Sequence, residues 1–182
     1  MNTDPLRINN EWVKKLKTGR IDLILSSLKE LRNQGNDSIL PEIMELMSKF
    51  RDDRIHTEVI GILNDLNNQS SVEIFMENLI NHRHSDYFVN MVSSCWQNGL
   101  DYSAYTGYFI DIVLKDDYAT SVEAFTVVES NVANLENRER DELADVIEKA
   151  KKDIAVEKLS LVNELHAVVK PFAGPFKMNP SP

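Results

Sequence analysis

Apolar residues recur along most of the chain with the three- and four-residue spacing of one face of a helix. The clearest example is the stripe formed by Ile21, Ile24, Leu25, Leu28 and Leu31. No segment alternates apolar and polar residues over a useful length, as a half-buried strand would. The pattern therefore predicts an all-α protein.

Polar turns, glycines and capping residues mark the ends of the predicted helices. A short helix from about 10 to 17 is expected to end at Thr18-Gly19, and its Trp12 is expected to cover the end of the fold. The helices that follow pair into hairpins. We expect these hairpins at 21–50, 54–82, 86–115 and 118–150.

The segment 138–169 contains neither glycine nor proline, but its apolar stripe changes register at Glu157 and Lys158. One long helix that rotates its buried face and two helices that meet near Asp153 both explain this change. We favour the break near Asp153.

The hairpins repeat. Acidic turns recur at Asp53, Asp86 and Asp117, which are 33 and 31 residues apart. The apolar segments after these turns close on Leu66, Leu100 and Leu135, with spacings of 34 and 35 residues. Such a period predicts an α-solenoid, in which each hairpin buries its apolar face against its neighbours.

Three regions follow from this pattern. Residues 1–20 are predicted to be an N-terminal cap segment, and 21–170 a solenoid domain with a long C-terminal helical region. The Pro-rich tail, 171–182, is predicted to be either disordered or an extended strap.

The charge of the chain narrows the classes of partner that it can bind. The chain has 182 residues and a net charge of −9, and residues 38–136 carry sixteen acids against five Lys and Arg. Nucleic acid is therefore a poor candidate partner, because a surface that follows phosphates needs clustered cations. A single cysteine and no long apolar run indicate a soluble, cytoplasmic protein without a membrane segment.

These repeats resemble HEAT-like repeats of the short bacterial type, and the resemblance implies a right-handed superhelix of antiparallel hairpins. Five residues before each closing leucine stands a small residue, namely Gly61, Cys95 or Ser130. The family often has a Val-Arg pair after the turn aspartate. That arginine is missing here, so the resemblance does not extend to a stacked Asp–Arg ladder.

No group of residues indicates catalysis, and no cofactor or metal is predicted. His82, His84 and Asp86 resemble metal ligands in type, but they are better interpreted as a polar turn with Asp86 as a helix cap. The acidic pairs that end in Asp53 and Asp117 recur at the same place in the repeat, which indicates that they cap the helices that follow. Cys95 lies on an apolar stripe and is interpreted as a buried, inert thiol.

In a solenoid, the second helices of successive hairpins usually line the binding face. The solvent-facing positions predicted on those helices are Glu42, Glu45, Glu73, Glu77, Asn78, Asn81, Tyr105 and Asp111. The leading interpretation is a non-catalytic scaffold module that binds a basic segment of a partner protein there. The alternatives are a HEAT-like enzyme, of the DNA-alkylation glycosylase or bilin lyase type, and a homodimer-forming structural module.

Overall fold

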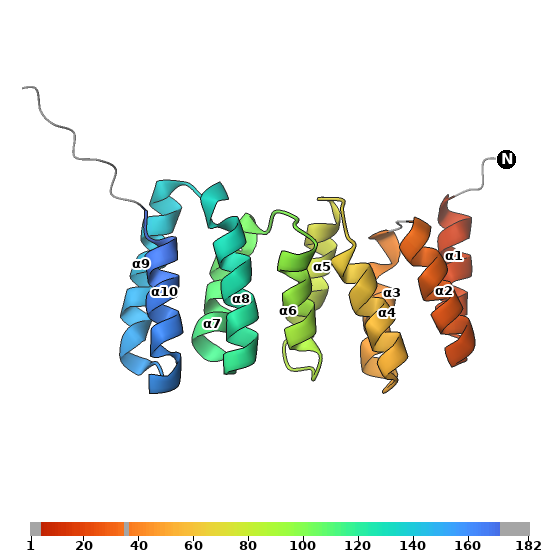
Figure 1. Cartoon of the computed structure of the whole chain (residues 1–182). Coiled ribbons are helices and arrows are strands. Elements are labelled where there is room, and N and C mark those ends of the chain that lie inside the picture. The colour runs from red at the N-terminus through yellow and green to blue at the C-terminus, as the bar shows by residue number, and fades with distance from the viewer. Residues whose placement is uncertain (1–4, 35–36, 172–182) are drawn as a thin grey trace, which may run out of the picture. The chain divides into compact units, whose positions relative to one another are not determined.

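The structure is a computed structural model that describes residues 5–34 and 37–171 (Figure 1). Within these ranges all regular elements are helical and there is no strand, which confirms the all-α prediction. The α-helices are α1 (Pro5–Leu16), α2 (Ile21–Gln34), α3 (Leu40–Lys49), α4 (Asp53–Asn64), α5 (Ser71–Asn81), α6 (Phe88–Gln97), α7 (Thr106–Lys115), α8 (Tyr118–Asn131), α9 (Asn137–Ala150) and α10 (Leu159–Val169).

Two predicted helix boundaries can be compared directly. Helix α1 begins at Pro5, five residues earlier than the predicted start at 10, because proline is well tolerated in a first helical turn. The break near Asp153 is confirmed: short 3₁₀ turns at Lys151–Asp153 and Val156–Lys158 separate α9 from α10. The predictions for the tail concern residues 171–182, of which 172–182 lie outside the described ranges.

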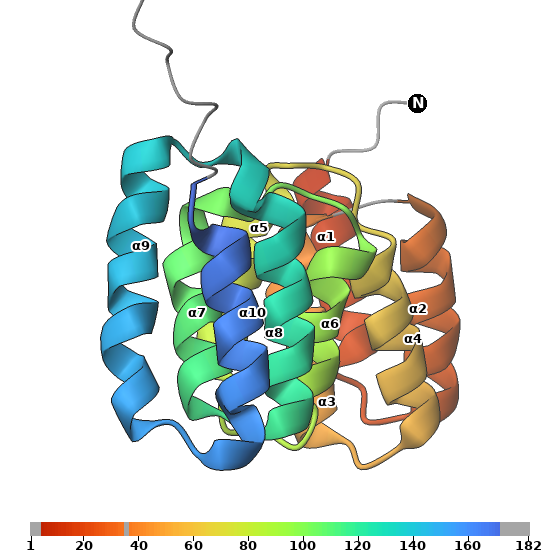
Figure 2. The ribbon, with the colours of Figure 1, turned by 60° about the vertical axis from the view of Figure 1, so that its left-hand side comes forward.

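The contacts of the chain divide it into two compact units, residues 1–102 and 103–182. In the first unit the helices form two layers. Helices α2, α4 and α6 pack side by side in one layer, and α1, α3 and α5 pack in the other (Figure 2). In the second unit α8 packs against α10, and α7 packs against both α8 and α9.

Two pairs of helices pack together across short acidic turns. Helix α3 packs on α4 across a three-residue turn that starts at Phe50, and α7 packs on α8 across Asp116 and Asp117. The predicted pair 118–150 would join α8 to α9, but α8 packs mainly against α7 and α10, and α9 packs against α10. These hairpins are therefore offset by one helix from the predicted ones.

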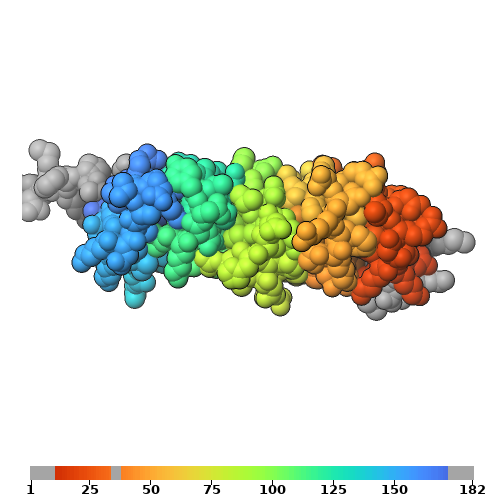
Figure 3. Space-filling model, turned by 90° about the horizontal axis from the view of Figure 1, so that it is seen from below, coloured from red at the N-terminus to blue at the C-terminus, as the bar shows by residue number. Residues whose placement is uncertain are grey.

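Apolar side chains fill the space between the two layers of the first unit. Phe75 and Tyr102 are completely buried, and their rings meet edge to face with centroids 6.3 Å apart. Asn98 donates to the Tyr102 hydroxyl at 2.9 Å and to the carbonyl of Leu63 at 3.2 Å. In the space-filling view the surface of this unit is continuous from its red residues to its green ones (Figure 3).

Some apolar residues of the helices are exposed. Ile80 and Trp96 are 44% and 39% exposed, and Val146 is 50% exposed. In α9 the buried residues are Ala144 and Ile147. Periodicity identifies the apolar side of a helix, but the width of the face that neighbouring helices cover depends on how those helices pack.

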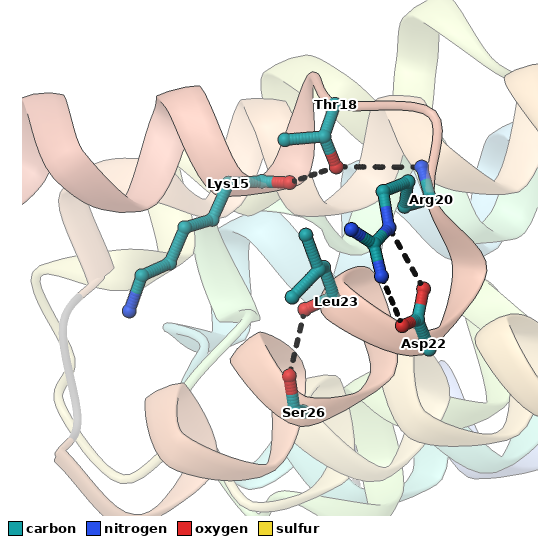
Figure 4. Close-up of polar contacts among 6 residues, drawn as sticks. All are labelled: Lys15, Thr18, Arg20, Asp22, Leu23 and Ser26. Atoms are coloured by element: carbon teal, nitrogen blue, oxygen red, sulfur yellow. Dashed lines mark hydrogen bonds and ion pairs between the residues drawn. The ribbon is translucent and has the colours of Figure 1, made fainter.

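The predicted end of α1 at Thr18-Gly19 is confirmed. Gly19 has a φ of +72°, a left-handed conformation that glycine adopts without strain. The Thr18 hydroxyl donates to the carbonyl of Lys15 at 2.9 Å and accepts the backbone N–H of Arg20 at 3.3 Å (Figure 4). Arg20 forms an ion pair with Asp22 at 2.8 Å, and α2 begins beside this turn. Trp12 is buried, and α1 packs on α2 and α3.

Candidate functional site

The structure brings six of the eight predicted partner-binding residues onto neighbouring helices. Helix α3 carries Glu42 and Glu45, and α5, which packs against α3, carries Glu73, Glu77, Asn78 and Asn81. The other two residues belong to the second unit, where Tyr105 immediately precedes α7 and Asp111 lies within it. We use the name acidic surface for the six residues of the first unit.

The carboxylates of the acidic surface differ in how far they are neutralised. Glu73 and Glu77 are exposed, Glu42 is half-buried, and none of the three has a cation partner within the described chain. Glu45 forms an ion pair with Lys49 at 2.8 Å. In the second unit, Asp111 forms an ion pair with Lys115. The negative charge that remains uncompensated on the acidic surface is therefore that of Glu42, Glu73 and Glu77.

The two amides of the acidic surface have different surroundings. The side-chain N–H of Asn78 donates to the carbonyl of Ile74 at 2.8 Å, so this donor is already used within α5. Asn81, at the last position of α5, is exposed. Of the two, Asn81 is the amide better placed for contact with a partner.

A small cavity of about 170 Å³ lies at one end of the acidic surface. Its lining combines the carboxylates of Glu42 and Glu45 with the cationic side chains of Lys17 and Lys49 and the apolar side chains of Leu16, Leu46 and Phe50. The two carboxylates therefore share this cavity with two cations of the chain itself, one of which, Lys49, is paired with Glu45.

The opposite layer of the first unit contains a larger cavity, of about 440 Å³, which we call the α4 groove. The stripe of Thr57, Ile60, Gly61 and Asn64 along α4 forms its floor. Arg32 of α2 lies on one side, and Tyr87 and Asn90 lie on the side of α6; Met47 and His56 complete the lining.

Two residues that line the α4 groove each have a buried polar atom without a hydrogen-bond partner among the described residues. These atoms are the hydroxyl of Tyr87 and Oδ1 of Asn64. Tyr87 is only 9% exposed, and its ring lies 5.9 Å from that of His56 and 6.0 Å from that of His82. Buried polar groups in proteins are almost always paired, so two such atoms in one cavity are unusual.

His56 is held in a defined orientation at the Tyr87 end of the groove. Its Nε2 lies 2.7 Å from the carbonyl of Phe50 and 3.2 Å from that of Met47. Because both neighbours are acceptors, Nε2 must carry a proton and donate. Its hydrogen bonds anchor the N-terminal part of α4 to the end of α3.

Sequence reasoning did not find the α4 groove, although the small residue Gly61 was a signal for it. Small residues, such as those at Gly61, Cys95 and Ser130, permit close packing of a neighbouring helix where they are buried. Cys95 is indeed buried, but Gly61 is half-buried and Ser130 is exposed. The nearest atoms to a Cβ at Gly61 would belong to the guanidinium of Arg32, the closest at 2.8 Å, and not to a helix backbone.

Repeat-spaced polar contacts join the helices that border the groove. Arg32 of α2 donates through Nε to Asp65, 33 residues later. Asn64 of α4 donates to the side-chain oxygen of Gln97 of α6, also 33 residues later, at 2.8 Å. The spacing of these contacts matches the repeat, although they use positions other than the missing family arginine.

The acidic pairs act as helix caps at two of the predicted turns. Asp52 caps α4, and a hydrogen bond from the Arg54 side chain is the main reason that the pKa of Asp52 is held at about 2. Asp117 caps α8. The prediction for Asp86 is wrong, because α6 begins at Phe88 after Tyr87 and has no side-chain cap.

The structure also places the other residues that the sequence offers as metal ligands or nucleophiles. The Nδ1 atom of His82 lies 2.7 Å from the carbonyl of Asn78, and the described ranges contain no cluster of three or more His, Cys, Asp or Glu placed to hold a metal. Cys95 is completely buried, and burial raises the pKa of its thiol, as expected for an inert cysteine. Among the described helices, none is long and apolar enough to cross a membrane.

Comparison of the chain with protein-family models, curated proteins and solved structures finds no match. The interpretation of its function therefore depends on the residues and contacts described above.

Proposed function

We propose that the chain is a HEAT-like α-solenoid that acts as a non-catalytic protein-binding module. The acidic surface on α3 and α5 would bind a basic segment of a partner protein. The observation that carries this proposal is the pair Glu73 and Glu77, one helical turn apart, exposed and without a cation partner in the described residues.

The surroundings of these two residues support a surface larger than one helix. Helix α3 packs beside α5 and contributes Glu42, which has no cation partner among the described residues. Cations of a basic segment could therefore approach Glu42 together with Glu73 and Glu77. Exposed complementary charges contribute mainly to the rate of encounter and to partner selection.

The repeat interpretation is supported by two kinds of contact. Each unit places its helices in two layers, with alternate helices packed against one another. Side-chain contacts between α2 and α4, and between α4 and α6, recur at 33 residues. Both features are typical of stacked helical hairpins.

The direct test is binding of a labelled, amphipathic, lysine-rich peptide of about twenty residues to the full chain, measured by fluorescence anisotropy. We expect saturable binding that weakens with salt, and no binding of the glutamate-rich counterpart. Exposed ion pairs contribute about 0.2–1 kcal/mol each, so changing Glu73 and Glu77 together to Gln should weaken binding about 2- to 30-fold.

A matched control removes the same charge elsewhere. Glu129 and Glu164 are exposed residues of α8 and α10, so changing both to Gln alters net charge equally without touching the acidic surface. If this control weakens binding as much as the Glu73 and Glu77 changes, binding depends on net charge alone and the proposed surface is wrong.

A further inference from the structure

We propose that the α4 groove is a second binding site, which holds a short, extended and uncharged segment of polypeptide. This site is separate from the acidic surface, because its floor and sides belong mainly to α2, α4 and α6. The inference does not depend on whether the acidic surface binds a basic partner.

The two unpaired polar atoms match the hydrogen-bonding groups of a peptide backbone. A buried tyrosine hydroxyl can donate one hydrogen bond, and a side-chain amide oxygen accepts. Tyr87 and Asn64 therefore offer a donor and an acceptor that have no partner in the described chain. A peptide backbone presents the matching carbonyl and N–H at every residue other than proline.

The length of the groove suits a short extended segment. Tyr87 lies beside His56, close to the start of α4, whereas Asn64 is the last residue of that helix. The eight-residue separation of His56 and Asn64 corresponds to about 12 Å along the helix axis. An extended chain covers about 3.3 Å per residue, so roughly four residues would reach from one unpaired atom to the other.

The charge of the groove favours an uncharged occupant. Among the described residues that line it, Arg32 is the only Lys, Arg, Asp or Glu, and its guanidinium is already paired with Asp65. A strongly charged occupant would lose its hydration on binding without gaining an opposite charge in the groove. Ile60 and Met47 provide an apolar part of the wall, which suits small apolar side chains of an extended segment.

Arg32 fills the middle of the groove. Gly61 has no side chain, and the guanidinium of Arg32 occupies the space above it, 2.8 Å from where a Cβ would stand. Only the Nε of this guanidinium donates to Asp65 among the described residues, so its other N–H groups are donors that a carbonyl of the occupant can accept.

The test uses the full chain and a displayed library of random linear nonapeptides. Enriched sequences are then synthesised with acetylated and amidated ends, and their affinity is measured by anisotropy. We expect enriched peptides with a net charge near zero. Tyr87→Phe, which removes only the hydroxyl, should weaken their binding at least 10-fold.

The thermal midpoint of Tyr87→Phe separates a binding role from a structural one. If the hydroxyl has no partner until a ligand binds, its removal from the free protein eliminates a buried unpaired group. The thermal midpoint should then stay the same or rise. A clear fall would show that the hydroxyl is already satisfied within the protein, and the proposal would be overturned.

One control variant and one blocking variant complete the design. Tyr118→Phe removes a hydroxyl from a tyrosine that is 53% exposed on α8 and does not line the groove. It should bind within about 2-fold of the unaltered chain. Thr57→Arg changes an exposed residue of the floor and should block binding without unfolding α4.

Three results would overturn the proposal. The library could yield no enriched sequence. Enriched peptides could keep their affinity for Tyr87→Phe and Thr57→Arg. Sedimentation could show that the groove is covered by a second copy of the chain, with self-association that Thr57→Arg abolishes.

Discussion

Arg32 and Asp65 lie 33 residues apart and form an ion pair that links α2 to the end of α4. The two side chains are 42% and 51% exposed, so solvent screens much of their attraction. A double-mutant cycle with Arg32→Ala and Asp65→Ala should give a coupling free energy of about 0.2–1 kcal/mol, measured by urea unfolding. The coupling should shrink in high salt. A coupling above about 2 kcal/mol would show that the pair is far better shielded than its exposure indicates.

Gly61→Ala tests how Arg32 sits on α4. Alanine is favoured over glycine in a helix interior by about 1 kcal/mol, but the new Cβ would stand 2.8 Å from a guanidinium nitrogen of Arg32. The guanidinium must move, and its pairing with Asp65 weakens. We expect a gain in unfolding free energy of about 1 kcal/mol in the Arg32→Ala background and a smaller gain in the unaltered chain. Equal gains in both backgrounds would contradict this contact.

Helix positions could be predicted from the sequence because each helix carries its own periodic stripe and stop signals. The break near Asp153 is an example: the change of register at Glu157 and Lys158 was visible without a glycine or proline, and the structure has 3₁₀ turns there. The burial of Cys95 followed from its place on the stripe of α6. These features depend on local sequence alone.

The pairing of helices and the α4 groove could not be predicted in the same way. Periodicity identifies a buried face but not which neighbour covers it, so α8 was assigned to α9 when it packs against α7 and α10. Tyr87 precedes the stripe of α6 and follows a polar turn, so no pattern indicated its burial. The contact of Asn64 with Gln97 joins two polar residues, which a search for apolar stripes does not detect.

Asp117 should make the stability of the second unit dependent on pH. Its carboxylate accepts the backbone N–H of Thr120 at 3.1 Å and the Thr120 hydroxyl at 2.6 Å, and these hydrogen bonds lower its pKa from 3.8. The stabilisation is therefore complete above pH 3.8 and is lost as the pH falls through the lower pKa of the folded state. Asp117→Ala should lower the unfolding free energy by about 1 kcal/mol at neutral pH, and by less in acid.

Asp117→Asn is the control for this prediction. Asparagine is also a good N-cap but has no acid to titrate, so its advantage over alanine should not change between pH 7 and pH 3. Chemical unfolding of the three proteins at several pH values would check it. A difference between Asp117 and Ala that stays constant down to pH 2 would show that the carboxylate does not stabilise α8 through its charge.

Arg140 should be the main stabiliser of the end of α10. From α9, its Nε donates to the carbonyl of Val169 at 2.9 Å, and Nη2 donates to those of Val168 at 3.0 Å and Lys170 at 3.1 Å. The last carbonyls of a helix have no partner within the helix, so one guanidinium satisfies three acceptors that would otherwise need water. Arg140→Ala should lower the unfolding free energy by about 1–3 kcal/mol. Arg140→Lys should recover less than half of that loss, because one ammonium cannot reproduce the planar arrangement of N–H donors in a guanidinium.

Deletion of residues 171–182 distinguishes this network from any contribution of the Pro-rich tail. All three carbonyls that Arg140 binds precede the deletion, so helicity and the unfolding free energy should stay within about 0.5 kcal/mol of the full chain. The predicted strap requires that the same deletion change self-association or partner binding, which sedimentation and peptide capture measure. Combining the deletion with Arg140→Ala should cost no more stability than Arg140→Ala alone. A larger loss in the combined variant would mean that the tail itself supports α10, and the strap would then be part of the fold.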